Sequence, residues 1–153
     1  MYRSLKNRFK RLQNGPLRIL VALAATIQQS IKFLSFVHVY TDKDGDWHNS
    51  RRNVTFVSPN LNVASYEAVA ASVKDLWCYN YLPTAGDVIV DVGAGIGDDA
   101  VAFSRMVGEK GLVIAIEAHP DTFRCLRKTI ESNCLKNVLA VNIAASDQEI
   151  ILY

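Results

Sequence analysis

The chain has 153 residues, half of them apolar, which suits one domain of ordinary size with a buried core. Its formal net charge of +2 is too small to argue for a nucleic-acid partner, so we expect none. Three widely spaced cysteines without a Cys-x-x-Cys pair argue against a disulfide framework or a zinc site, and they favour reduced thiols in a cytoplasmic protein.

The first 35 residues combine a basic start with a helical pattern over residues 16–35. Its apolar face, which we expect to pack on the chain's own domain, consists of Leu17, Leu20, Val21, Ala24, Ile27, Ile31 and Leu34. The apolar run is too short for a membrane span. A signal peptide stays an alternative, although the pattern continues past the small residues where it would be cleaved. The basic residues also leave peripheral contact of residues 1–35 with an anionic membrane open.

Two short strands are predicted next, over residues 36–40 and 54–57. The turn between them, residues 42–46, has aspartates at alternating positions, as calcium loops do. An EF-hand loop also needs glycine at its sixth position and glutamate at its twelfth. Counted from Asp42, these positions hold Trp47 and Asn53, so we interpret the segment as a solvated turn.

A second helical pattern covers residues 64–80, with Asn62 or Ser65 as its cap. The face that we expect to be buried carries Tyr66, Val69, Val73, Leu76 and Trp77. We therefore divide the chain into an extension, residues 1–63, and a second domain, residues 64–153.

From Asp87 onward strands and helices alternate, which predicts an α/β domain with a parallel sheet. Strands are expected over residues 88–92, 112–116 and 138–143, helices over 98–107 and 120–133, and the start of a fourth strand over 149–153. The first strand is almost entirely apolar, which is typical of a strand covered on both faces.

A candidate binding site follows from two of these strands. Glycines 93, 95 and 97 form the turn after the first strand, where missing side chains let the backbone approach a ligand. Glu117 ends the next strand, and carboxyl ends of parallel strands are where open α/β sheets bind ligands. A carboxylate there can accept hydrogen bonds from both hydroxyls of a ribose. We therefore predict a nucleoside cofactor.

The spacing of acidic residues favours S-adenosylmethionine over NAD. The dinucleotide fingerprint needs its third glycine at position 98, where this chain has Asp98. An acid there would repel a pyrophosphate at the helix N-terminus. S-adenosylmethionine has no phosphate, and its sulfonium and ammonium groups suit nearby acids such as Asp91.

Residues 78–153 resemble the first half of the FkbM family of methyltransferases. The matching stretches are residues 81–97, which include Val88-Ile-Val-Asp-Val-Gly-Ala-Gly-Ile-Gly97, and residues 107–120, 133–138 and 142–147. The resemblance implies a Rossmann-like class I methyltransferase fold, S-adenosylmethionine as the methyl donor, and transfer to a hydroxyl of a small molecule, glycan or lipid. The cofactor-binding residues that we expect are Asp91, Gly93, Ala94, Gly95, Gly97, Glu117, Ala118, Ala145, Ser146 and Asp147.

The family's later motif and remaining strands are missing, so the resemblance implies an incomplete sheet, the first βαβαβ half. No residue stands out as a catalytic base, and no metal site is predicted. The sequence leaves two functions open: a methyltransferase for which this chain supplies the cofactor-binding half, or a non-catalytic nucleoside-binding or interaction module. A truncated sheet would also expose a strand edge and favour self-association.

Overall fold

The computed structural model describes Gly15 and residues 17–146, which fall into two compact units, Met1–Val63 and Ala64–Tyr153. That residues 1–63 form an extension and residues 64–153 the cofactor-binding domain stays a prediction. The fourth strand expected over residues 149–153 and the basic residues 1–14 lie outside the described residues. Within residues 17–146, none of the helices is both long enough and apolar enough to cross a membrane.

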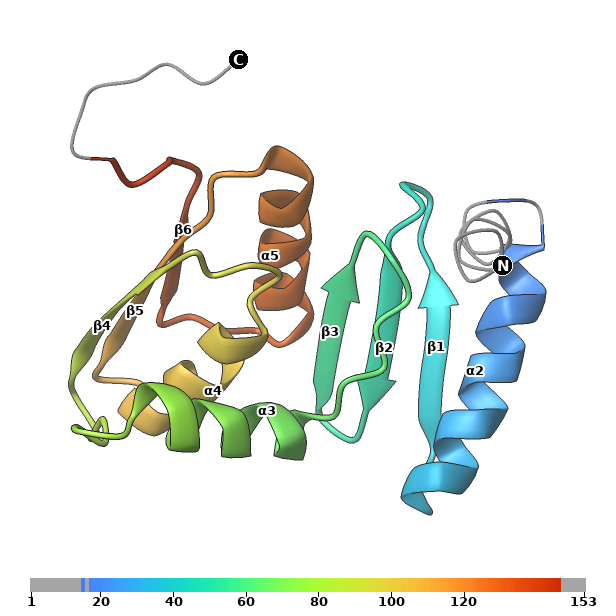
Figure 1. Cartoon of the computed structure of the whole chain (residues 1–153), viewed down its shortest axis with the longest axis horizontal. Helices are drawn as coiled ribbons and strands as arrows, with labels where there is room; N and C mark the ends of the chain where they lie inside the picture. Colours follow the sequence, from blue (N-terminus) through green and yellow to red (C-terminus); the bar gives the residue numbers. More distant parts are fainter. Residues whose placement is uncertain (1–14, 16, 147–153) are drawn as a thin grey trace, which may run out of the picture. The chain divides into compact units, whose positions relative to one another are not determined.

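The first unit is a helix packed on a three-stranded antiparallel sheet (Figure 1). Helix α2 (Arg18–Phe33) precedes β1 (Val37–Thr41), β2 (Trp47–Arg51) and β3 (Val54–Ser58), which lie side by side in the order β1-β2-β3. The sequence pattern did not predict β2, because its polar residues lack the strand signal of its neighbours. Trp47 at its start is nonetheless part of the core of this unit.

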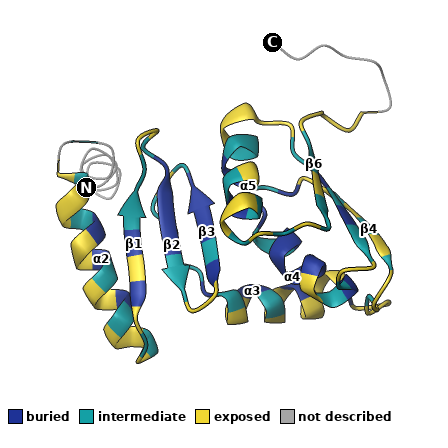
Figure 2. Cartoon of the chain, turned by 180° about the vertical axis from the view of Figure 1, so that it is seen from behind, coloured by how far each residue is buried: buried dark blue, intermediate teal, exposed yellow. Residues whose placement is uncertain are grey.

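Helix α2 packs with the face opposite to the one expected. Its buried residues are Ala22, Ala25 and Gln29, and the face that carries Leu20 and Ile27 is exposed, as the yellow bands along α2 in Figure 2 show. Two hydroxyls explain the choice. Thr26 Oγ1 accepts a hydrogen bond from the N–H of Val39 at 2.9 Å, and Ser30 Oγ accepts one from the N–H of Val37 at 2.9 Å. Small residues and these hydroxyls bring the helix against the edge strand β1, so the predicted buried face is wrong.

The aspartate turn between β1 and β2 is closed by one side chain. Asp42 Oδ1 accepts hydrogen bonds from the backbone N–H groups of Asp44 and Asp46, both at 3.0 Å, and Asp42 Oδ2 lies 3.1 Å from His48 Nε2. The carboxylates of the three aspartates lie within 4.8 Å of one another. The segment is a turn, as predicted, but Asp46 within it is buried rather than solvated.

The second unit has the predicted Rossmann-like βαβαβ arrangement, which confirms the fold class. Its elements are α3 (Tyr66–Ser72), the π-helical turn η1 (Val73–Trp77), β4 (Val88–Val92), α4 (Asp98–Val107), β5 (Leu112–Ile116), α5 (Pro120–Ser132) and β6 (Val138–Val141). The three strands are parallel in the order β4-β5-β6. Ser65, one of the two expected caps, starts α3 by accepting a hydrogen bond from the N–H of Ala68 at 3.2 Å.

One face of this parallel sheet is covered and the other is open within the described residues. Val113 and Ala115 of β5 are fully buried, and α4 and α5 are drawn on the same side of the sheet in Figure 1. In β4, Val88, Val90 and Val92 are exposed, whereas Ile89 and Asp91 on the alternate face are partly buried. The expectation that both faces of this strand are covered is therefore wrong for residues 17–146.

The end of the helix before β4 also differs from the expectation. Val69 and Val73 are buried as predicted, but Leu76 and Trp77 are exposed. The wider π-helical turn at residues 73–77 shifts the helical register, so side chains after Val73 leave the buried stripe. As a result, Trp77 is available at the surface beside the start of α4.

Candidate cofactor site

The turn after β4 is fixed onto the end of β5 by backbone hydrogen bonds. The N–H groups of Gly93 and Ala94 both donate to the carbonyl oxygen of Ile116, at 2.8 and 2.9 Å. Gly93, Gly95 and Gly97 all have positive φ, of 82°, 56° and 85°. Side chains rarely allow this conformation, so the glycines are needed for the turn to close against the neighbouring strand.

Glu117 joins this turn to the loop after β5. Its Oε2 accepts a hydrogen bond from the N–H of Gly95 at 3.0 Å, and its Oε1 accepts one from the N–H of His119 at 2.8 Å. Each carboxylate oxygen can accept more than one hydrogen bond, so the group keeps acceptor capacity for a ligand. The structure therefore brings together Glu117 and the glycine turn, which the sequence had placed 20 residues apart.

Asp91 lies inside β4 with one carboxylate oxygen unused. Its Oδ2 is buried and has no hydrogen-bond partner. Burial, followed by the negative charges of Asp99 and Asp98, raises the pKa of Asp91 to about 6. A cationic group placed here would offset the cost of burying the charged carboxylate and the repulsion from the neighbouring aspartates.

Two further side chains bond to residues beside these groups, and the sequence predicts neither of them as part of the site. Asn142, directly after β6, donates from Nδ2 to the carbonyl oxygens of Glu117 and Ala118, at 2.7 and 3.1 Å. Trp77 donates from Nε1 to Asp99 Oδ2 at 3.0 Å. The sequence names Asn142 only within the stretch 142–147 that carries the resemblance, and its helical pattern predicts that Trp77 is buried.

The other predicted contact residues fall into three groups. Ala94 is buried within the glycine turn, whereas Ala118 is exposed in the loop after Glu117. Ala145 and Ser146 are exposed in the segment after β6. Asp147 lies outside the described residues. The cofactor contacts of all these residues stay predictions.

Two of the three glycines in the turn face open space. A Cβ atom built on Gly93 would meet nothing within 4 Å, and one on Gly95 would reach only the Gly93 carbonyl oxygen at 4.0 Å. Gly97 differs, because its Cβ would lie 2.6 Å from Cδ1 of Leu126 in α5. The first two glycines therefore leave room in front of the turn, and Gly97 lets α4 approach α5.

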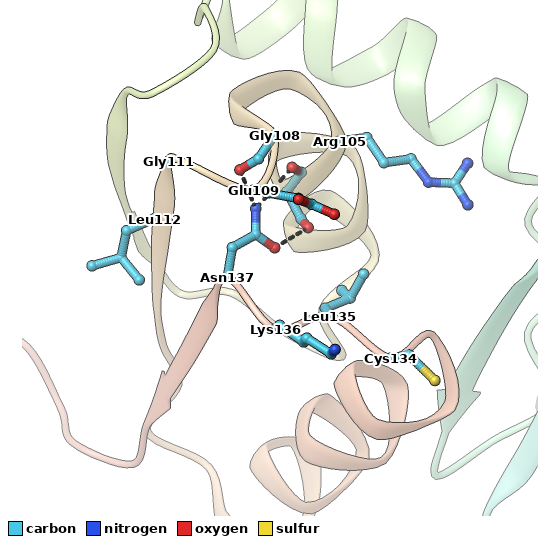
Figure 3. Close-up of a pocket in the computed structure, with 10 residues that line it drawn as sticks. Arg105, Gly108, Glu109, Gly111, Leu112, Cys134, Leu135, Lys136 and Asn137 are labelled. Atoms are coloured by element: carbon cyan, nitrogen blue, oxygen red, sulfur yellow. Dashed lines mark hydrogen bonds between the residues drawn. The ribbon is translucent and has the colours of Figure 1, made fainter.

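A cavity of about 710 Å³ lies at the opposite, amino edge of the same sheet (Figure 3). Its lining includes Leu112, the first residue of β5, and Asn137, which precedes β6. Asn137 Nδ2 donates to the carbonyl oxygens of Ser104 and Gly108, at 3.0 and 2.9 Å, and its Oδ1 accepts from Ser104 Oγ at 2.6 Å. These bonds tie β6 to the end of α4, so the residue serves the fold and the cavity is separate from the cofactor site.

Comparison with known proteins identifies the family. The model of the family Protein-L-isoaspartate(D-aspartate) O-methyltransferase (PCMT) matches residues 43–148, more than half of the chain. A probable cobalt-precorrin-6B C(15)-methyltransferase (decarboxylating) from Sulfolobus acidocaldarius is 42% identical over 53 residues, which are 35% of this chain and 28% of that protein. A protein-L-isoaspartate O-methyltransferase from Thermotoga maritima is 34% identical over 53 residues, 35% of this chain and 17% of that protein.

Among solved structures, a protein-L-isoaspartate O-methyltransferase aligns with a TM-score of 0.43 and 22% identity, over 74% of this chain and 31% of that chain. The chain thus spans less than a third of the length of the curated relatives it matches.

These findings overturn the resemblance to the FkbM family and the glycan or lipid acceptor that it implied. The glycine turn and Glu117, which lie within the stretches that carried the resemblance, are at the carboxyl edge of the sheet, and they contain no information about the acceptor. S-adenosylmethionine as the cofactor is confirmed. The chain belongs to the protein-L-isoaspartate(D-aspartate) O-methyltransferase (PCMT) family of S-adenosylmethionine-dependent methyltransferases.

Proposed function

We propose that the chain supplies the cofactor-binding part of a transferase that methylates a carboxylate oxygen on an isoaspartyl or D-aspartyl residue of a protein. The observation that supports this most directly is the match of the family model to residues 43–148, which include the whole glycine turn and Glu117. Glu117 would bind the ribose hydroxyls, and Asp91 would face the positive charge of the cofactor.

The acceptor chemistry suits a site without an assigned base. When bound, S-adenosylmethionine supplies a methyl group whose C–S electron pair stays with sulfur as an acceptor oxygen forms the new C–O bond. A carboxylate is already ionised at neutral pH, so it does not have to lose a proton before it attacks. The task left to this chain is to hold the cofactor in one orientation, so that an acceptor oxygen can approach in line with the methyl group.

A second candidate function rests on the 42% identity to the cobalt-precorrin-6B methyltransferase, whose name describes transfer to carbon. The two candidates differ in the stability of the product, because a methyl ester is hydrolysed by alkali whereas a carbon-bound methyl group is not.

The test is a transfer assay with S-adenosylmethionine labelled in its methyl group. The acceptors are an isoaspartyl peptide, the matched aspartyl peptide and a cobalt-precorrin. We expect label on the isoaspartyl peptide that alkali releases as methanol, and none on the aspartyl peptide. Alkali-stable label on the corrinoid would favour the second candidate. If the chain binds S-adenosylmethionine but labels none of the acceptors, it does not carry out the transfer by itself, and a non-catalytic binding module is favoured over both candidates.

A further inference from the structure

Trp77 occupies an unusual place for a large aromatic residue. It ends the π-helical turn η1, and 65% of its surface is exposed. Its indole N–H nevertheless has a defined partner, Asp99 Oδ2, at 3.0 Å and 22 residues further along the chain. An exposed side chain that is fixed in this way loses conformational entropy, and the hydrogen bond has to offset that loss.

The partner of Trp77 lies next to the glycine turn of the candidate cofactor site. Asp99 lies in the first turn of α4, two residues after Gly97, and its neighbour Asp98 belongs to the same turn. The charge of Asp99 acts on Asp91, so the two carboxylates are close enough to interact. Burial and then the charge of Asp98 raise the pKa of Asp99, and the Trp77 hydrogen bond opposes that rise. The indole therefore helps to keep a negative charge at this position.

We infer that Trp77 is a positioning residue that holds the Asp99 carboxylate toward the sulfonium of the cofactor, and so sets the preference of the site for S-adenosylmethionine over S-adenosylhomocysteine. The inference rests on the proposed cofactor site. The two ligands share adenosine, ammonium and carboxylate groups, and they differ in the methyl group and the positive charge on sulfur. An oriented carboxylate near that sulfur attracts the charged ligand and leaves the neutral one unaffected.

The effect of the oriented carboxylate is measured by the ratio of the dissociation constants for S-adenosylhomocysteine and S-adenosylmethionine. Calorimetric titration of the full chain gives both constants. Trp77→Phe keeps an aromatic ring but removes the N–H donor. We expect it to lower the preference for S-adenosylmethionine by about two- to fivefold, as expected when one partly solvated charge loses its alignment. Tyr79→Phe is the matched control, because Tyr79 is exposed in the same segment, and it should leave the ratio unchanged.

A double-mutant cycle separates positioning from general damage. Asp99→Asn should lower the ratio by itself, and Trp77→Phe in the Asp99→Asn background should lower it no further, because the carboxylate it acts through is gone. A ratio that Trp77→Phe leaves unchanged, or that falls equally in both backgrounds, would overturn the inference. If the unsubstituted chain binds neither ligand, the proposed cofactor site itself is wrong.

Fluorescence provides a measurement that needs no substitution. The chain has two tryptophans, and Trp47 is only 1% exposed, so quenching by acrylamide reports mainly on Trp77. Saturating S-adenosylmethionine should protect the accessible tryptophan from acrylamide. Unchanged quenching at saturation would show that ligand binding does not affect the Trp77–Asp99 pair, and this would overturn the inference even if Trp77→Phe failed to fold.

Discussion

The carboxylate of Glu117, in the loop after β5, accepts a hydrogen bond at 3.0 Å from the backbone N–H of Gly95, in the turn after β4. This contact joins the two sequence features that predicted the cofactor. Glu117 thus orients the glycine turn, and its remaining acceptor capacity is what we propose binds a ribose.

Replacing Glu117 with alanine should weaken S-adenosylmethionine binding by more than about tenfold, since losing hydrogen bonds to a charged group costs about 1.5–3 kcal/mol. Asp121→Ala is the control, because Asp121 pairs with Arg124 on the exposed surface of α5 and should not touch the ligand. Calorimetry on both variants measures the difference. Equal losses of affinity would contradict the role of Glu117.

Replacing Asp91 with asparagine should stabilise the chain near neutral pH. The pKa of Asp91 in the folded chain is about 6, above the ordinary value of 3.8, so the folded state binds this proton more tightly than the unfolded state. Its ionisation therefore lowers the free energy of unfolding as the pH rises from about 4 to about 6. Allowing for solvent screening, Asp91→Asn should raise that free energy by about 1–2 kcal/mol at about pH 7.5 and change it little at about pH 4. Urea denaturation at both pH values tests this, and a larger gain at the lower pH would refute the assignment.

The same variant should bind S-adenosylmethionine more weakly, because the negative charge that faces the cofactor is lost. In the unsubstituted chain the dissociation constant should rise as the pH falls below about 6, where Asp91 takes up its proton. Titrations across this range should give a flatter profile for Asp91→Asn. An identical profile in both chains would place the titrating group elsewhere.

Two glycine substitutions should separate folding from binding. Gly97→Ala places a Cβ atom 2.6 Å from Leu126 Cδ1 at a φ of +85°, so we expect it to lower the free energy of unfolding by about 2–4 kcal/mol. Gly93→Ala has a similar φ but open space, so backbone strain alone should cost about 1 kcal/mol. The affinity for S-adenosylmethionine should show the opposite order. Gly93→Ala should weaken binding more than Gly97→Ala, because its added Cβ atom obstructs the ligand. If Gly93→Ala destabilised more than Gly97→Ala, the packing role of Gly97 would be wrong.

Asn137→Ala should destabilise the chain without affecting the cofactor. The variant loses three hydrogen bonds that tie β6 to the end of α4, so the free energy of unfolding should fall by about 2–3 kcal/mol. The affinity for S-adenosylmethionine should be unchanged in the folded fraction, because Asn137 lies at the other edge of the sheet. Lys136→Ala, an exposed neighbour, serves as the control. Weaker binding with unchanged stability would indicate a functional role for the cavity in Figure 3.

The sequence predicted the second unit well because its signals are local. The strand 88–92 and the helix 98–107 coincide with β4 and α4, the glycine turn lies between them, and Glu117 directly follows β5. Each of these depends on short-range patterns: an apolar run, glycines at positive φ and helical spacing. The cofactor edge then followed from the rule that parallel strands share their carboxyl ends.

The errors arose where tertiary contacts decide. Nothing in the helical periodicity shows that the hydroxyls of Thr26 and Ser30 would bring the small-residue face of α2 onto β1. A π-helical turn has no clear sequence signal, so the exposure of Trp77 was missed together with its bond to Asp99. The acceptor was wrong for a different reason, because the residues that carried the resemblance are those predicted to bind the cofactor, and they contain no information about the acceptor.

The central claim is that the edge formed by the glycine turn, Asp91 and Glu117 is a site for S-adenosylmethionine. Parallel calorimetric titrations of the full chain with S-adenosylmethionine and with NAD test it most directly. The account predicts saturable binding of S-adenosylmethionine that Glu117→Ala weakens by more than about tenfold, and no measurable binding of NAD. Tighter binding of NAD, or binding of S-adenosylmethionine that is indifferent to Glu117→Ala, would contradict it.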